Sequence, residues 1–204
     1  MAKLFSIKPS ITIKGRKFKG IRGWAGKPTH PPLTDLPIAA YVLAAAFDVV
    51  SFIAWKMKGA DSTIASDAFI AATWAMVGGA VASLGAVFTG FWDWWKGLDR
   101  DRTNGLIGKA SHTQVWRTAN WHMTVMLTVT AIVILDIVIR IGQYDKHYAT
   151  LITTILSVLA GVLVSYGATY GGSLVFDYQF NVEGLKGSTA WNESEEDQLP
   201  GHKS

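Results

Sequence analysis

The 204-residue sequence contains no cysteine. Without thiols, the chain can form no disulfide, bind no iron–sulfur cluster through thiolates and use no cysteine nucleophile. Any metal ion or cofactor would therefore be held by histidine, methionine, carboxylate, tyrosine or backbone atoms. The sequence also lacks a GxSxG, an HExxH and a phosphate-binding glycine loop. No motif thus indicates a hydrolase, a kinase or a nucleotide-binding enzyme, and we do not expect an enzyme.

Four long stretches of the sequence contain almost no charge. Their only acidic or basic side chains are Asp48, His122 and Asp136. These stretches cover residues 36–55, 68–92, 118–139 and 148–176. Because a helix needs about 20 mainly apolar residues to cross a bilayer, each stretch is long enough. We predict transmembrane helices at about 36–56, 68–94, 118–141 and 148–176. The predicted fold is an all-α, integral membrane four-helix bundle. Although the net charge of +4 could suit nucleic acid, the long apolar stretches predict that the partner is the lipid bilayer.

The segments that flank this transmembrane domain, residues 30–183, differ in charge. Residues 1–29 hold eight Lys or Arg and no acid, and they lack the apolar core of a signal peptide. Residues 184–204 are polar and mainly acidic, a composition that predicts a disordered tail. Four spans place both termini on one side, which receives 15 of the 19 Lys and Arg. Because basic flanking segments stay in the cytoplasm, we predict that both termini are cytoplasmic.

Polar side chains recur at helical spacing along the predicted spans, so each span has one distinctive face. The residues on these faces are Tyr41 and Asp48 in the first span, Gly79, Ser83, Ala86, Gly90 and Asp93 in the second, His122, Met126, Asp136 and Arg140 in the third, and Tyr166, Tyr170 and Asp177 in the fourth. Ionisable groups are costly when they face lipid. We therefore expect the four faces to point inward, toward one another.

The alternating direction of the spans predicts a cluster of ionisable residues at the cytoplasmic ends of the helices. Its members are His30, Asp35, Asp93, His122 and Asp177. Two histidines and a carboxylate could bind iron or another divalent metal, and Met126, one turn beyond His122, could add a soft ligand. In a plainer interpretation these residues only hydrogen-bond with one another, and Asp35 is the N-cap of the first helix.

A second polar level lies deeper in the predicted bundle. At 1.5 Å per residue, Asp48 lies about 20 Å beyond Asp35 along its helix. We expect its partners to be hydroxyl groups or water. The candidate residues are Thr128, Thr130, Ser165 and Tyr166. Asp136 and Arg140 are four residues apart and predict an ion pair within their helix, near the far interface.

Several motifs together resemble the bacterial membrane family called domain of unknown function 2231. They are HPPLTDLPIAAYVLAAAFD (30–48), TGFWDWW (89–95), WHMTVM (121–126) and GGSLVFDYQFNVE (171–183). The matching positions are His30, Pro31, Asp35, Pro37, Asp48, Asp93, Trp94, His122, Gly171 and Gly172. The resemblance implies a four-helix bundle in a bacterial cell membrane. Relatives joined to Rieske or cytochrome c modules imply redox partners.

Three functional hypotheses follow. The first is an accessory or anchor subunit associated with electron transfer, with the His–Asp cluster at its cytoplasmic ends and a homo-oligomer as one form it could take. The second is a redox protein that binds haem b or a metal through His30 and His122, with the small residues from Gly79 to Gly90 as the slot for the macrocycle. That small-residue stripe could instead serve close helix packing. The third is a small transporter or proton-conducting protein that uses Asp48.

Overall fold

The computed structural model describes residues 20–21, 28–97 and 113–181. Within these residues there are four long helices and one short 3-10 helix. They are α1 (His30–Lys58), α2 (Thr63–Gly97), α3 (Gln114–Ile141), η4 (Tyr144–Lys146) and α4 (Leu151–Phe176). All four long helices are apolar enough to cross a membrane. The predicted all-α membrane bundle is therefore confirmed, whereas the side on which the termini lie stays a prediction.

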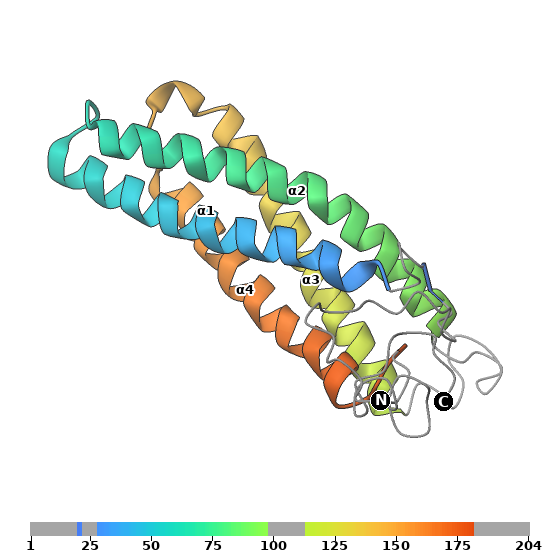
Figure 1. Ribbon diagram of the computed structural model, residues 1–204. Helices are drawn as coiled ribbons and strands as arrows, with labels where there is room; N and C mark the ends of the chain where they lie inside the picture. The colour runs from blue at the N-terminus through green and yellow to red at the C-terminus, as the bar shows by residue number, and fades with distance from the viewer. Residues whose placement is uncertain (1–19, 22–27, 98–112, 182–204) are drawn as a thin grey trace, which may run out of the picture.

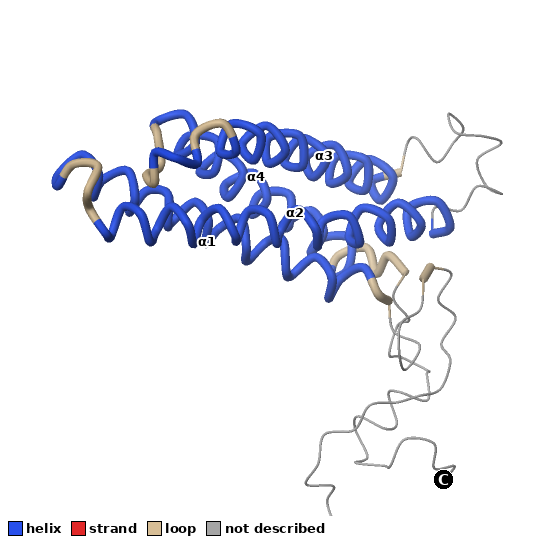
Figure 2. Tube along the Cα trace, turned by 90° about the horizontal axis from the view of Figure 1, so that it is seen from above, coloured by secondary structure: helices blue, strands red, loops and turns tan. Residues whose placement is uncertain are grey.

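The helices form an elongated bundle of two antiparallel pairs, α1 with α2 and α3 with α4 (Figures 1 and 2). Helix α1 packs against α2 and α4, and α3 packs against α4 and, less extensively, α2. Helices α1 and α3 therefore occupy diagonally opposite corners. The start of α1 and the end of α4 lie at the same end of the bundle (Figure 1).

Helix α1 begins six residues earlier than predicted, at His30, and ends at Lys58. Prolines occupy its first turn, where their missing N–H groups cost little. Thr29 is the N-cap residue, so the expectation that Asp35 caps this helix is wrong. Asp35 instead lies within the helix and is exposed. The other boundaries differ from the expected ones by at most five residues.

Close approach of α1 to its neighbours depends on two glycines. A Cβ atom at Gly79 of α2 would lie 2.7 Å from Cε1 of Tyr41, and one at Gly161 of α4 would lie 3.2 Å from Cβ of Ala45. Small residues are the usual contact points between membrane helices because they let two backbones come close. The glycines therefore explain how α1 can pack tightly on both α2 and α4.

An apolar core fills the middle of the bundle. Its buried residues are Tyr41, Ala44, Ala72, Met76, Val129, Val133, Ala160 and Val164. Many large apolar side chains point outward instead, such as Trp74, Leu84 and Val162, which are 67, 70 and 61 % exposed. An outer surface this apolar suits lipid rather than water, in agreement with a multi-pass membrane protein.

Candidate functional site

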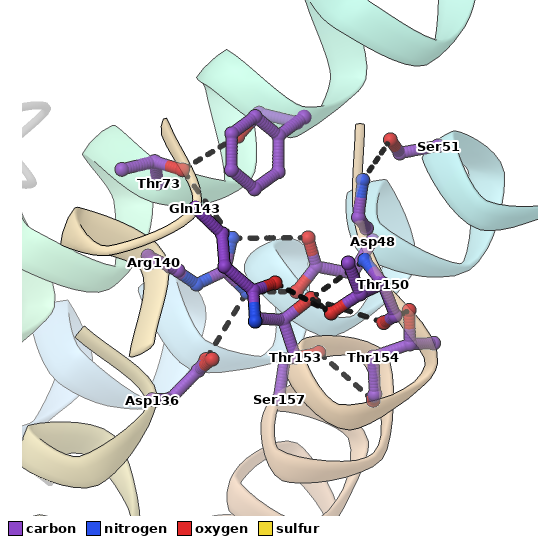
Figure 3. Close-up of polar contacts among 12 residues, drawn as sticks. Asp48, Ser51, Thr73, Asp136, Arg140, Gln143, Thr150, Thr153, Thr154 and Ser157 are labelled. Atoms are coloured by element: carbon purple, nitrogen blue, oxygen red, sulfur yellow. Dashed lines mark hydrogen bonds and ion pairs between the residues drawn. The ribbon is translucent and has the colours of Figure 1, made fainter. Parts of the chain in front are cut away.

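Asp48, Asp136 and Arg140 form a buried group of charged side chains, which we call the ion cluster (Figure 3). The three side chains are 0, 0 and 1 % exposed. Arg140 donates from Nη1 to Oδ1 of Asp48 at 3.1 Å and from Nη2 to Oδ2 of the same carboxylate. Its Nη2 also donates to Oδ2 of Asp136 at 3.1 Å. One guanidinium group thus joins carboxylates from two helices.

The ion cluster contacts all four long helices. Asp48 belongs to α1, and Asp136 and Arg140 belong to α3, so the side chain of Arg140 reaches across the diagonal of the bundle. On α2, the Thr73 hydroxyl accepts from Arg140 at 3.3 Å, and the Phe69 ring lies 5.6 Å from the guanidinium carbon. On α4, Ser157 lies beside Asp48, and its hydroxyl donates to the carbonyl of Thr154 at 3.1 Å. Hydrogen bonds of Arg140 therefore join α1, α2 and α3, and α4 packs beside Asp48.

The expected partners of Asp48 were wrong. Thr128, Thr130 and Ser165 donate to carbonyl groups of their own helices instead. Arg140 takes their place because a guanidinium offers a carboxylate two charge-assisted hydrogen bonds, which are stronger than a neutral one. The predicted Asp136–Arg140 pair is present, but it is buried in the bundle and not a separate interfacial pair.

The inward face predicted for the fourth span was also wrong. Tyr166 is 42 % exposed, and its hydroxyl lies 2.8 Å from that of Tyr170 and accepts from Nε1 of Trp121 at 3.3 Å. Asp177 is likewise exposed. The face of α4 that is buried contains small residues. These are Thr153, Ser157, Ala160, Gly161 and Gly167, with Val164 among them. Small side chains allow closer helix packing than two tyrosines would.

A second polar centre lies at the opposite end of the bundle, where α1 and α3 begin. The rings of His30 and His122 are edge to face, with centroids 6.5 Å apart. Nδ1 of His122 lies 2.8 Å from the carbonyl oxygen of Gly167. Because a carbonyl can only accept, this nitrogen carries a proton, and in the neutral ring Nε2 then keeps its lone pair.

The same reasoning applies to His30. Its Nδ1 lies 3.3 Å from Oγ1 of Thr89, and that hydroxyl donates its proton to the carbonyl of Gly85 at 2.8 Å. The hydroxyl is thus left to accept from Nδ1, so in the neutral ring Nε2 of His30 also keeps a lone pair. The two imidazoles, which we call the histidine pair, therefore have the same tautomer and one unprotonated nitrogen each.

Glycines make room for the histidine pair. A Cβ atom at Gly90 would lie 2.5 Å from Cε1 of His30, and one at Gly171 would lie 3.1 Å from Cε1 of His122. The slot predicted for a haem is therefore filled by this chain's own side chains, with Tyr41 against Gly79 and His30 against Gly90. The described residues do not fit a haem at that position.

The other predicted ligands have different surroundings. Asp93 is buried and accepts from the backbone N–H of Ile21 at 3.3 Å. Asp177 accepts from Ser173, and the side chain of Met126 packs against Gly167. In the described part of the chain, no three His, Asp or Glu side chains are grouped so that they could hold a metal ion. The structure thus unites only the two histidines of the predicted set.

The two polar centres are separated by the apolar core. Along α3, His122 is followed by Val129 and Val133 and only then by Asp136. The other helices have the same order, for example Gly167, Val164, Ala160 and Ser157 along α4. Near the histidine pair's side of this layer, the hydroxyl groups of Tyr41 and Ser83 form a hydrogen bond of 2.7 Å. The ion cluster and the histidine pair are therefore distinct sites.

Comparison with known proteins gives a family and no individual relative. No curated protein and no solved structure matches the chain. The family described as Predicted membrane protein (DUF2231) matches residues 26–184, a range that includes the four helices and both polar centres. The resemblance noted in the sequence is thereby confirmed, and the chain belongs to this family of membrane proteins.

Proposed function

We propose that this protein is an integral membrane anchor subunit whose bundle provides a rigid base for a partner. The observation that supports this most directly is the ion cluster, because one buried arginine ties α1, α2 and α3 together. Removing one partner from such a buried pair costs about 3–5 kcal/mol. A cluster of this kind resists relative movement of the helices, as an anchor requires.

The apolar core favours an anchor over a conduit. A proton or solute that crossed the bundle would need polar groups or water along the way. Between the ion cluster and Tyr41, the core instead contains apolar residues from all four helices, such as Ala44, Met76, Val133 and Ala160. These residues separate the two polar centres, which argues against a transport path that uses Asp48.

The partner of this anchor is expected to be a redox protein, as the association of similar bundles with Rieske or cytochrome c modules implies. The basic segment 1–29 and the acidic segment 184–204 lie mostly or wholly outside the described residues. Their opposite charges suit electrostatic attachment of a protein at the membrane surface. Charge complementarity of this kind sets association rate and orientation more than raw affinity.

The proposal can be tested on the full-length tagged chain in its native membranes. After mild detergent extraction, native electrophoresis should place the chain in an assembly larger than the purified chain alone, with a haem or iron–sulfur absorbance in the same band. Amide replacement of the four tail acids should release the chain from this assembly while the bundle stays folded. The replaced residues are Glu193, Glu195, Glu196 and Asp197. The matched control is Asp67→Asn, an exposed acid near the start of α2.

Two results would contradict an anchor function. One is a chain that migrates alone when extracted from its own membranes. The other is a purified chain that, after reconstitution into liposomes, dissipates a proton gradient faster than empty liposomes do.

The histidine pair favours a second candidate function, the binding of a transition metal ion. Metal-bound histidines typically donate their other ring N–H to a carbonyl or similar acceptor, which fixes the ring. His122 and His30 both use Nδ1 in this way, with Gly167 and Thr89 as acceptors. Imidazole suits zinc, copper and iron, and water would complete the coordination.

Metal titration of the purified chain tests this candidate. One Zn²⁺ or Cu²⁺ per chain should bind, and either His30→Ala or His122→Ala should abolish binding. His147→Ala is the matched control, because that histidine lies at the far end of the bundle after η4. The double variant His112→Ala/His202→Ala should also bind normally. Equal binding by the wild type and both histidine-pair variants would exclude the site.

A further inference from the structure

The charges of the ion cluster do not balance. Arginine stays protonated in proteins, so two ionised carboxylates and one guanidinium would leave one negative charge at a fully buried position. An unpaired buried charge is very costly, and at membrane depth water cannot compensate for it. Either a second cation or a proton must therefore neutralise the cluster.

None of the described residues that surround the cluster supplies a second cation. Helix α1 contributes only Asp48 as a charged group at this level, since its next charged residue is Lys56, two turns further on. Helix α4 contains no charged residue between Leu151 and Phe176. Helix α2 contributes Phe69 and Thr73, which are neutral. In the adjoining loop, Asp145 and Lys146 are exposed. A proton is thus the remaining source of positive charge.

The hydrogen bonds indicate which carboxyl group holds that proton. Each oxygen of Asp48 accepts from an N–H group of Arg140, a set of donors that suits an anion. Asp136 accepts a single bond, at Oδ2. Its Oδ1 is buried and has no hydrogen-bond partner. An ionised carboxylate can accept several hydrogen bonds, so the less solvated Asp136 is the better place for the proton.

We propose that Asp136 carries a proton in the resting protein, so that the ion cluster is an electrically neutral proton-binding site within the membrane bundle. The proton resides on Oδ1, while Oδ2 accepts from Arg140. Binding is a simple transfer from water, in which the carboxylate of Asp136 becomes a carboxylic acid. The site is distinct from the histidine pair and does not depend on the anchor function.

Infrared spectroscopy of the purified chain in detergent tests this assignment, because a protonated carboxyl group has a carbonyl band that a carboxylate lacks. At neutral pH the wild type should show this band. Asp136→Asn should lose it and should fold as the wild type does, since a neutral amide has nearly the same shape as a carboxylic acid. Asp93→Asn is the matched control, because Asp93 is a buried acid at the other end of the bundle. This control should keep the band.

Each other outcome contradicts the proposal. Absence of the band in the folded wild type would mean that both carboxyl groups are ionised. Loss of the band in Asp93→Asn would assign the proton to Asp93. A band that persists in Asp136→Asn would place the proton elsewhere. Failure of Asp136→Asn to fold, while Asp93→Asn folds, would show that the negative charge of Asp136 is required.

Discussion

The two polar centres of this bundle solve the same problem in different ways. Both bury ionisable groups between membrane helices, but the ion cluster pairs opposite charges whereas the histidine pair places two neutral rings side by side. In the first, stability comes from the long reach of Arg140. In the second, it comes from the absence of side chains at Gly90 and Gly171.

Because of this difference, the ion cluster is suited to holding the helices together, whereas the histidine pair is suited to binding a ligand. The guanidinium Nη atoms and Asp48 are fully engaged within the chain, so the ion cluster offers little to an outside ligand other than a proton. The histidine pair keeps one lone pair on each ring, and both rings are only partly buried. The histidine pair is therefore the better site for a metal ion, and the ion cluster is the better site for fixing the helices relative to one another.

The largest expected effect is that of Arg140→Met, which removes the cation of the ion cluster. It leaves two carboxyl groups buried without their cation, and we expect a loss of about 3–5 kcal/mol in unfolding free energy. Thermal unfolding monitored by tryptophan fluorescence in detergent would measure the change. Lys146→Met, which removes an exposed cation six residues later, should have almost no effect. Equal stability of both variants would mean that the ion cluster does not hold the bundle together.

Raising the pH should also lower the stability of the folded bundle, but by less than Arg140→Met does. If Asp136 is protonated only in the folded bundle, the stability that its proton provides is complete below the pKa of the unfolded side chain, about 4, and is lost progressively as the pH rises above that value. The unfolding temperature of the wild type should therefore fall as the pH is raised toward the alkaline side. In Asp136→Asn this part of the pH dependence should disappear. An unchanged alkaline slope in that variant would assign the loss to another group.

Much of this arrangement could be predicted from the sequence, since long uncharged stretches predict spans and the spacing of Asp136 and Arg140 predicts contact within one helix. The partner of Asp48 could not be predicted in the same way, because it depends on how far α1 extends beyond the end of α3. One signal was present nevertheless: the first span has a single acid and the third ends in a single base, and opposite charges in a membrane tend to pair.

The buried face of a helix could be predicted only where the small side chains and the polar side chains lie on the same face. In the second span, small residues and Asp93 lie on one face, and the structure buries that face. In the fourth, tyrosines and glycines lie on different faces, and polarity alone favoured the tyrosine face. The structure buries the face with small residues, since membrane helices associate through close packing more than through polarity. The histidine pair was predictable from topology, but its tautomers required the positions of Gly167 and Thr89.

At the histidine end, Gly90→Ala should give an intermediate effect. The new methyl group would lie 2.5 Å from Cε1 of His30, so the ring must move away from Thr89. We expect a loss of about 1–3 kcal/mol, as for other overpacked sites, together with weaker metal binding. Gly78→Ala on the same helix is the control, because its Cβ would meet nothing within 4 Å. That variant should be as stable as the wild type or slightly more so. If Gly90→Ala left both stability and metal binding unchanged, the ring of His30 would not be held against α2.

The smallest expected effect concerns the hydrogen bond between Tyr41 and Ser83, which lies between the two centres. Hydrogen bonds between membrane helices are worth only about 0.6 kcal/mol on average, because the unfolded chain in lipid finds other partners. Tyr41→Phe, Ser83→Ala and the double variant form a thermodynamic cycle whose coupling energy should be close to that value. A coupling of several kcal/mol would instead mean that this bond holds the helices together as the ion cluster does, and that the layer between the two centres is not mainly apolar packing.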